Sequence, residues 1–365
     1  MLEGHGGNIH EAARIAGCLP SGIIDLSSNI SPFPPSRIIM DRLKEGLREI
    51  SALPEVASQS LAGLVARRHN LSEGQVLIGN GTTELIFSLP RSPGSRSALI
   101  CAPTYSDYAD SCRLSSVETR FLFCRKEENF EFDLRRLRTE AGKADLVFLC
   151  NPNNPTGALV GGESLRGLIR LLPSTTFIID ESYLPFVEGG DADSMLKGDI
   201  PDNLIVLRSF SKIHAIPGLR LGWLASSERT VETLRSRMLP WSVNRLAQIA
   251  GEAILESAQG GNLEEDTARY MAVERTEFLA RLAPLMHGAG AANPLAVYPG
   301  KANFLLFELK GTIDAPVFFN LMLKRRILVR DCSNFRGLGS RFFRISLKTR
   351  EMNSLCIDAM LEILG

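Results

Sequence analysis

The hydrophobic positions of the chain fall into short continuous runs, and most of these runs end in a turn rich in glycine, proline or asparagine. A short run of β-branched and other apolar residues predicts a buried strand, and a longer amphipathic stretch predicts a helix. Between residues 75 and 240 the two patterns alternate, with strands expected at 76–79, 97–102, 119–124, 145–150, 175–180, 204–208 and 220–225. This alternation predicts an α/β fold with a mostly parallel central sheet that helices cover on both faces.

The pattern differs in the remaining parts of the chain. Residues 241–286 have a helical pattern, and further strands are expected at 303–308, 327–330 and 341–347. The prolines of the stretch 32–35 predict a stiff extended connector rather than a helix. We therefore expect a large domain at 41–245, a smaller α+β domain at 246–365, and an N-terminal segment at 1–40 that packs with the smaller domain.

The composition limits the classes of partner. The 365 residues are 44% hydrophobic, which is enough for a large core, and 41 basic residues balance 41 acidic ones. Because there is no net charge, no overall field favours nucleic acid or an anionic membrane. The seven cysteines lack the spacing of metal ligands, no apolar run is long enough to span a bilayer, and the N-terminus lacks an export signal. We expect a cytoplasmic protein that binds neither nucleic acid, membrane nor metal.

The segment SFSKIHAIPGLRLGW places Lys212 directly after an apolar strand, between hydroxyl groups and a downstream arginine. A lysine amine can form a Schiff base with the aldehyde of pyridoxal 5'-phosphate. Ser209 and Ser211 can donate hydrogen bonds to the phosphate, and Arg220 can bind it through its planar guanidinium group. The alternative interpretation is an ordinary surface lysine in a turn.

Two upstream segments favour the cofactor site over that alternative. The run TTFIIDESY, residues 175–183, predicts a buried strand that ends at Asp180, and a carboxylate there can pair with a pyridinium nitrogen. Such a pair keeps the pyridine ring an electron sink for a carbanion at the substrate's α-carbon. Tyr183 in the same segment and Asn154 in the turn NPNNPTG can each hydrogen-bond the ring oxygen O3′.

The ordered motifs NPTG, DESY and SFSK resemble those of the fold-type-I pyridoxal-phosphate enzymes in the aminotransferase class I and II superfamily, over nearly the whole chain. The resemblance implies a large domain with the parallel sheet, a smaller domain formed by the two chain ends, and a homodimer. It implies that Lys212 carries the Schiff base, that Asp180 lies at the pyridine nitrogen, and that Tyr183 and Asn154 lie at O3′. Lys212, Asp180 and Tyr183 are the expected catalytic residues.

The resemblance also implies two further contacts with the cofactor. The loop GNGTTE, residues 79–84, lies between a short strand and a helix, so the amides of Gly81, Thr82 and Thr83 should face the phosphate at a helix N-terminus. Tyr105 in CAPTYSDY matches the position whose ring stacks on the cofactor; its alternative is a half-buried tyrosine at a strand end.

The N-terminal run HGGNIHEAARIAG, residues 5–17, and the tail RRILVRDCSNFRGLGSRFFRIS, residues 325–346, resemble those of the threonine-phosphate decarboxylases within this superfamily. That resemblance implies decarboxylation of a phosphorylated amino acid, in the synthesis of the lower-ligand arm of cobalamin. Histidinol-phosphate aminotransferases are the alternative, and they usually lack the HGGN start. The implied substrate contacts are His5, Gly6, Gly7, Asn8, Asn154, Arg330 and Arg344.

Some points stay open. A flexible terminal residue in solvent is the alternative for His5, and we interpret Arg341 as a solvated charge at a strand edge.

The relatives have a tyrosine that reaches the cofactor phosphate across the dimer, whereas Leu53 stands here and has no hydrogen bond to donate. The change leaves open weaker cofactor retention, compensation by the threonines, or another substrate such as serine phosphate. A non-catalytic cofactor-binding regulator is disfavoured, because such proteins generally carry a DNA-binding domain for which 365 residues leave no room.

Overall fold

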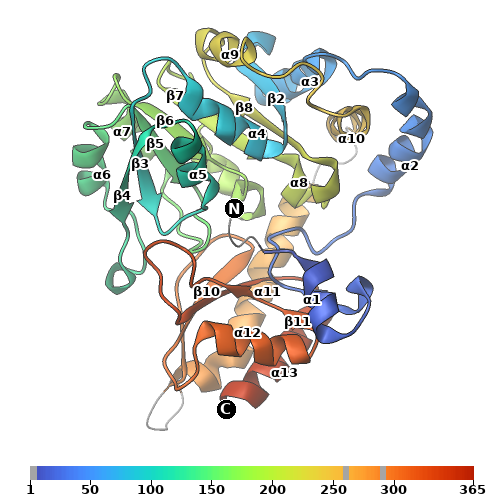
Figure 1. The fold of residues 1–365 in the computed structure, drawn as a ribbon, viewed down its shortest axis with the longest axis vertical. Coiled ribbons are helices and arrows are strands. Elements are labelled where there is room, and N and C mark those ends of the chain that lie inside the picture. The colour runs from blue at the N-terminus through green and yellow to red at the C-terminus, as the bar shows by residue number, and fades with distance from the viewer. Residues whose placement is uncertain (1–5, 258–262, 288–292) are drawn as a thin grey trace.

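The computed structural model describes residues 6–257, 263–287 and 293–365. Figure 1 shows a larger upper part, which contains the central sheet, and a smaller lower part that combines both ends of the chain. The central sheet has seven strands in the order β2-β8-β7-β6-β5-β3-β4, and all of them run parallel except β8. Its strands are β2 Val76–Asn80, β3 Ser97–Ala102, β4 Glu118–Phe123, β5 Leu146–Cys150, β6 Thr176–Asp180, β7 Leu204–Ser209 and β8 Leu221–Ala225.

Both faces of this sheet are buried. Successive strand residues point to opposite faces, and in β6 the side chains of Phe177 and Ile178 accordingly join two different core clusters. Helices α4, α5 and α9 contribute to one cluster, and α3, α6, α7 and α10 contribute to the other. The helices are α2 Arg37–Gly46, α3 Gln59–His69, α4 Gly81–Ser88, α5 Asp107–Leu114, α6 Leu134–Ala141, α7 Gly162–Arg170, α8 Phe210–Ile213, α9 Glu228–Arg235 and α10 Arg245–Glu256. The predicted α/β class, with a mostly parallel sheet, is confirmed.

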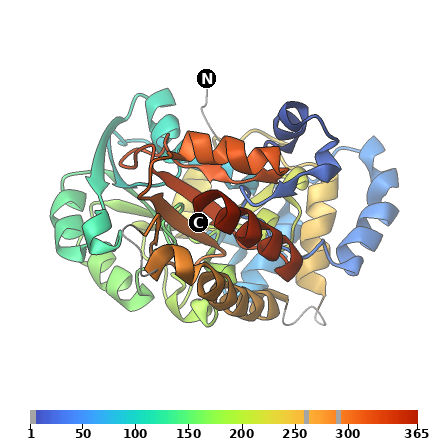
Figure 2. The same cartoon turned by 90° about the horizontal axis from the view of Figure 1, so that it is seen from below.

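The smaller part is built on an antiparallel sheet in the order β12-β13-β10-β9, and a separate parallel pair joins β1 near the N-terminus to β11. Figure 2, seen from below, shows α11, α12 and α13 beside these strands. The strands are β1 Ile24–Asp25, β9 Leu295–Val297, β10 Phe304–Leu309, β11 Ile327–Leu328, β12 Arg330–Asp331 and β13 Phe342–Ser346. The helices are α1 Ile9–Ala16, α11 Leu263–His287, α12 Ala315–Lys324 and α13 Arg350–Leu364.

The predicted helical stretch 241–286 contains two helices, α10 and α11, and residues 258–262 between them lie outside the described part. Helix α10 packs against α2 and α3 in the upper part of Figure 1. The β1–β11 pair joins the N-terminal segment to the smaller part, while the domain boundaries at residues 40 and 245 stay predictions.

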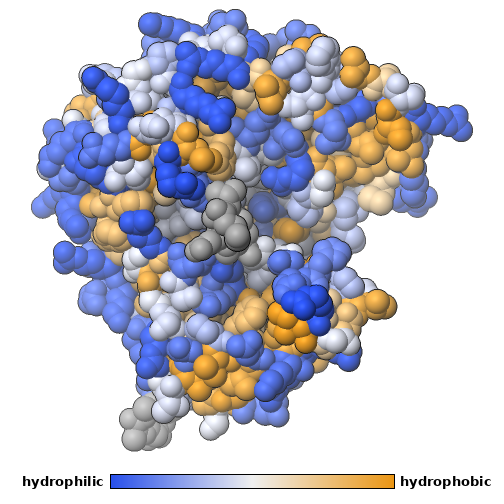
Figure 3. All heavy atoms as spheres, viewed as in Figure 1, coloured by the Kyte–Doolittle hydropathy of each residue, from blue (hydrophilic) through white to orange (hydrophobic). Residues whose placement is uncertain are grey.

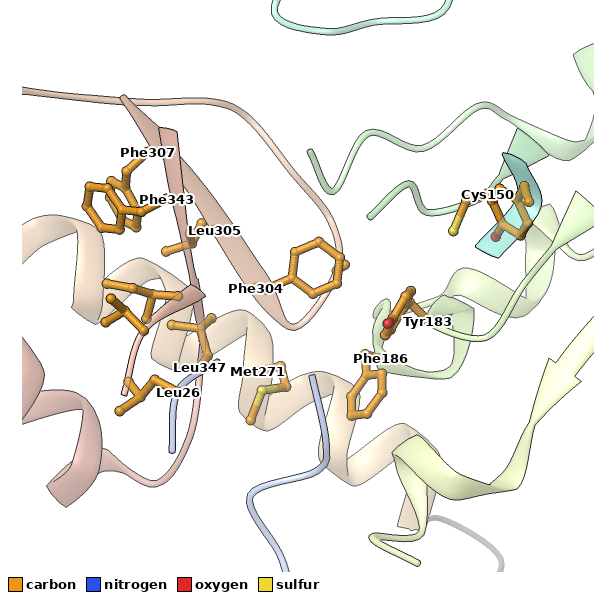
Figure 4. Packing of buried hydrophobic residues seen from close by; sticks show 14 of the residues in the cluster. Leu26, Cys150, Tyr183, Phe186, Met271, Phe304, Leu305, Phe307, Phe343 and Leu347 are labelled. Atoms are coloured by element: carbon orange, nitrogen blue, oxygen red, sulfur yellow. The ribbon is translucent and has the colours of Figure 1, made fainter. Parts of the chain in front are cut away.

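One apolar cluster continues from the larger part into the smaller one. Figure 4 shows Tyr183, next to the central sheet, facing Phe304 at the start of β10. Their rings meet edge to face, with centroids 5.1 Å apart and an interplanar angle of 86°. The joint between the two parts is therefore packed beside Tyr183. Within the described ranges, no helix has the length and apolar character needed to cross a membrane.

Candidate active site

The predicted cofactor residues gather at one edge of the central sheet, because the carboxyl ends of parallel strands lie on the same side. Residues 81–83 follow β2, Tyr105 follows β3, Asn154 follows β5, and Asp180 ends β6. Strand β8 is reversed, so its beginning lies at this same edge and brings Arg220 to it. Figure 3 shows the molecular surface indented between the upper and lower parts on its right side.

The cofactor residues predicted from the sequence line one cavity, with the exception of Gly81. Gly81 lies next to Arg220, which is part of the lining. The cavity is lined by Thr82, Thr83, Tyr105, Tyr108, Cys150, Asn154, Asp180, Ser182, Tyr183, Ser209, Ser211, Lys212 and Arg220. Residues from sequence positions 82 to 220 thus form a single site.

Hydrogen-bond donors are concentrated at one end of this cavity. Gly81 starts α4 with a φ of +71°, and an added Cβ there would lie 2.8 Å from Arg220 Nη2. The same Nη2 donates to Thr83 Oγ1 at 3.4 Å. Within the described part of the chain, the side chain of the N-cap residue Asn80 makes no capping hydrogen bond to α4, so the first amides of this helix are available to an anion. Ser211 donates to the carbonyl of Leu221 at 3.2 Å.

A buried carboxylate marks another side of the cavity. Asp180 Oδ2 accepts a hydrogen bond from the Tyr108 hydroxyl at 2.7 Å, and its Oδ1 accepts the amide of Ser182 at 2.9 Å. Burial and the neighbouring Asp180 raise the pKa of Tyr108 well above its usual value, so this phenol stays a donor. The sequence pattern did not predict Tyr108 or Ser182 as site residues, although Tyr108 follows Tyr105 by three positions. The Ser182 hydroxyl is buried and has no partner in the described part of the chain.

Lys212 lies on the short helix α8 and is half-buried. Its pKa is lowered to about 8, mainly by burial and also by the cations Arg220 and Arg344, while Asp180 opposes the shift. A substantial fraction of this amine is therefore neutral near pH 8, which a nucleophilic lysine requires.

Arg344 on β13 connects the smaller part to the cofactor cavity. Its guanidinium group is buried, donates to Asn154 Oδ1 and to the Ser27 carbonyl, and lies 5.2 Å from the Phe304 ring centroid. The Arg344 Nε atom is buried without a partner among the described residues. The pKa of the nearby Tyr183 is raised to about 12, mainly by burial, although Arg344 opposes that rise. Asn154 and Arg344, two predicted substrate contacts, are thus in direct contact.

The remaining predicted substrate residues surround a neighbouring hollow. Gly6, Gly7, Asn8 and Arg330 line it together with Ser27. The Gly7 amide donates to Ser27 Oγ at 2.7 Å, so Ser27 joins this hollow to Arg344. The Asn8 side chain caps α1 by accepting the amide of Glu11, and His5 lies outside the described residues.

Two other predicted features lie away from the cavity. Leu53 is 74% exposed and does not line it. Arg341 is exposed and donates to backbone carbonyls at Gly311 and Ile313, which suits a charge at the edge of the sheet.

The donor set fits pyridoxal 5'-phosphate. A guanidinium group, hydroxyls and uncapped helix amides suit a phosphate, and the carboxylate of Asp180 suits a protonated ring nitrogen. Tyr183 and Asn154 can contact the phenolic oxygen, and Lys212 can supply the amine. The buried, unpartnered Ser182 hydroxyl shows that the cavity has capacity for a further polar contact.

Comparison with known proteins agrees with this geometry. The family model for aminotransferase class I and II matches residues 21–360. The chain is 32% identical to threonine-phosphate decarboxylase of Salmonella typhimurium, over 99% of this chain and 96% of the relative. Among solved structures, L-threonine-O-3-phosphate decarboxylase from Porphyromonas gingivalis is 28% identical with a TM-score of 0.80, covering 93% of this chain and 98% of the other.

The histidinol-phosphate aminotransferase structure from Clostridium acetobutylicum is similarly close, with 26% identity, a TM-score of 0.83, and coverage of 93% of this chain and 98% of the other. The similarity therefore extends to enzymes of two reaction types on one fold. The chain belongs to the aminotransferase class I and II family, and its cofactor is pyridoxal 5'-phosphate.

Proposed function

We propose that the enzyme decarboxylates an O-phospho amino acid, converting L-threonine O-3-phosphate to (R)-1-aminopropan-2-ol O-2-phosphate and CO₂ for cobalamin synthesis. The observation that carries the proposal is the pair of arginines from the smaller part. Arg344 reaches Asn154 in the cofactor cavity, and Arg330 lines the adjoining hollow with the glycines of the N-terminal segment. Two separate cations suit a substrate with a carboxylate and a phosphate.

The two arginines have different surroundings, which suggests different roles. Arg344 is buried close enough to Lys212 to lower the pKa of its amine, so it is placed to hold the carboxylate near the reacting carbon. Arg330 lies farther out, donates to Asn334 at 2.8 Å, and is placed to hold the phosphate. Bidentate guanidinium contacts restrict rotation, so together they can turn the carboxylate out of the plane of the cofactor ring.

The other side chains would hold the cofactor, which when bound withdraws electrons from the substrate's α-carbon. Asp180 keeps a proton at the ring nitrogen, and Tyr108 holds that carboxylate in place. We propose Arg220 and the start of α4, with Ser209 and Ser211, as the phosphate site, and Tyr183 with Asn154 at O3′. The amine of Lys212 binds the cofactor and can return a proton to the α-carbon after CO₂ has left.

The test compares Arg330→Ala and Arg344→Ala with Arg341→Ala, whose native side chain donates to two backbone carbonyls at the sheet edge. Each active-site variant should lose at least about tenfold in kcat/KM for threonine phosphate while still binding the cofactor, and the Arg341→Ala control should keep wild-type activity. Equal rates on threonine and threonine phosphate would contradict the proposed anion site.

The second candidate is histidinol-phosphate aminotransferase, which the Clostridium structure favours through its 26% identity and TM-score of 0.83. Incubation with histidinol phosphate and 2-oxoglutarate separates the two candidates. Formation of glutamate, without CO₂ from threonine phosphate or serine phosphate, would replace the decarboxylase by the aminotransferase.

A further inference from the structure

Residues 27–31, here called the strap, cross the joint between the two parts of the molecule beside the active site. On the side of the smaller part, the Ser27 carbonyl accepts from Arg344. On the side of the larger part, the Ser31 amide donates to the backbone carbonyl of Lys212 at 2.9 Å. The strap therefore contacts both the predicted substrate arginine and the backbone of the predicted catalytic lysine.

The middle of the strap presents a buried amide to the site. Asn29 is 3% exposed, and hydrogen bonding from its side chain opposes the rise in the pKa of Tyr183 that burial causes. The Asn29 Oδ1 atom is buried without a partner within the described ranges. A small shift of the strap would therefore move a group that touches Tyr183.

A second buried lysine holds the strap. Lys348 Nζ donates to the carbonyl of Ser28 at 2.9 Å and to that of Ile30 at 2.8 Å, on either side of Asn29. The backbone of Lys348 is fixed in turn by Asn353 on α13, which accepts its amide at 2.8 Å. The lysine thus links α13 to the strap.

Burying a cation at this link carries a desolvation cost. Lys348 is 6% exposed; its pKa is lowered to about 8, mainly by burial and also by Lys212 and Arg344, while Asp25 opposes the shift. A neutral donor would satisfy both carbonyls without burying a charge beside two other cations. An unfavourable charge of this kind is typical of functional sites rather than of structural links.

We propose that Lys348 is a positioning residue of the active site, which holds the strap so that Asn29 faces Tyr183 and adds its positive charge to the surroundings of Lys212. The inference rests on the proposed role of Lys212 as the cofactor lysine.

The test uses Lys348→Met, which removes the charge and both hydrogen bonds, and Lys324→Met as the control at an exposed lysine of the smaller part. In Lys348→Met holoenzyme, the pH midpoint of the cofactor's visible absorption should rise by about half a unit or more, since a nearby cation no longer opposes protonation. Deuterium uptake by residues 28–33 should become at least about fivefold faster, because the strap is released. The control should change neither quantity.

A wild-type midpoint together with wild-type exchange in Lys348→Met would overturn the proposal. Lys348→Gln divides the two effects, because its amide still donates to the carbonyls but has no charge: the midpoint should rise while exchange stays slow. If neither variant folds, the wild-type chain provides the test. The Ser31 amide should then exchange slowly, because the held strap keeps its hydrogen bond to the Lys212 carbonyl closed, and exchange at the rate of an unprotected amide would contradict the role.

Failure of the proposed function would be visible separately. Borohydride reduction and peptide mapping show whether Lys212 holds the cofactor, and deuterium exchange of the strap does not depend on which substrate is used.

Discussion

The amine of Lys212 lies among charges of both signs, and its ionisation sets when it can act. Its pKa is lowered to about 8, mainly by burial. The apoenzyme should therefore capture pyridoxal phosphate faster as the pH rises to about 8, and the rate should then level off, because the amine is already neutral. Stopped-flow absorbance between pH 6 and 10 measures this, with Lys212→Ala as the control. A rate that keeps rising to pH 10 would show that the amine titrates like an ordinary lysine.

The two neighbouring carboxylates of the DESY segment should behave differently on substitution. Asp180→Asn should retain the cofactor but slow turnover by several orders of magnitude, because the ring nitrogen loses its anionic partner. Tyr108→Phe removes one hydrogen bond to that carboxylate and should cost about 1.5 to 3 kcal/mol of transition-state stabilisation. Near-normal turnover in Asp180→Asn would remove this residue from the mechanism.

Glu181 should matter for stability rather than for chemistry. It points to the other side of the strand end, is fully buried, and pairs with buried Arg208 at 2.9 Å. Glu181→Ala should lower the free energy of unfolding by about 3 to 5 kcal/mol, because Arg208 is left buried and unpaired. Urea unfolding measures the loss, with Glu232→Ala at an exposed ion pair as the control. Equal losses in both variants would contradict this interpretation.

Sequence motifs predicted that Lys212, Asp180 and Arg220 share a site, and the structure brings all three to one cavity, while their roles stay predictions. The motifs missed Tyr108 and Lys348, because their contacts depend on how distant segments fold together. Tyr108 meets Asp180 across 72 positions, and Lys348 meets the strap across 320. The local sequence around Tyr108 and Lys348 therefore does not indicate these contacts.

At the scale of elements, the start of α4 offers a direct test of the phosphate site. Gly81→Ala should cost about 1 kcal/mol of stability, because its φ is +71°, and it should also weaken cofactor binding, because the new Cβ meets Arg220. Gly94→Ala is the matched control: its φ is +86°, but nothing lies within 4 Å of the new Cβ. Titration with pyridoxal phosphate should show weaker binding for Gly81→Ala alone. Equal affinities in the two variants would contradict the predicted phosphate site.

The seven strands of the central sheet follow the hydrophobic pattern closely, because strands buried on both faces are continuous apolar runs. The short strands β1 and β9 were not predicted, and the run 327–330 contains two strands, β11 and β12. A strand of two or three residues is too short to show an alternating hydrophobic pattern in the sequence. Such strands become visible only when the folded structure pairs them with a neighbour.

At the scale of the whole molecule, we propose a homodimer. Apolar side chains are exposed over α2 and the residues after it, where Figure 3 shows a hydrophobic area at the upper right. Ile50 is 66% and Leu53 74% exposed, and the backbone of Trp241 contacts that of Val56 nearby. Such a patch is unusual on a monomer and suits a second copy of this chain, as the sequence resemblance at Leu53 also implies.

Light scattering should then give twice the chain mass of 40.0 kDa. The double variant Ile50→Asp with Leu53→Asp should shift the mass toward one chain, whereas Leu171→Asp, at a separate exposed leucine, should not. A monomeric wild-type protein would contradict the proposed assembly.

The central claim is that the bond broken at the α-carbon is the one to the carboxylate. The most direct test is release of labelled CO₂ from O-phospho-L-threonine that carries the label in its carboxyl group, followed with and without 2-oxoglutarate. We predict that labelled CO₂ and aminopropanol phosphate form in equal amounts, that 2-oxoglutarate has no effect, and that unphosphorylated threonine releases none. Turnover that requires 2-oxoglutarate and leaves the label in a keto acid would contradict the account.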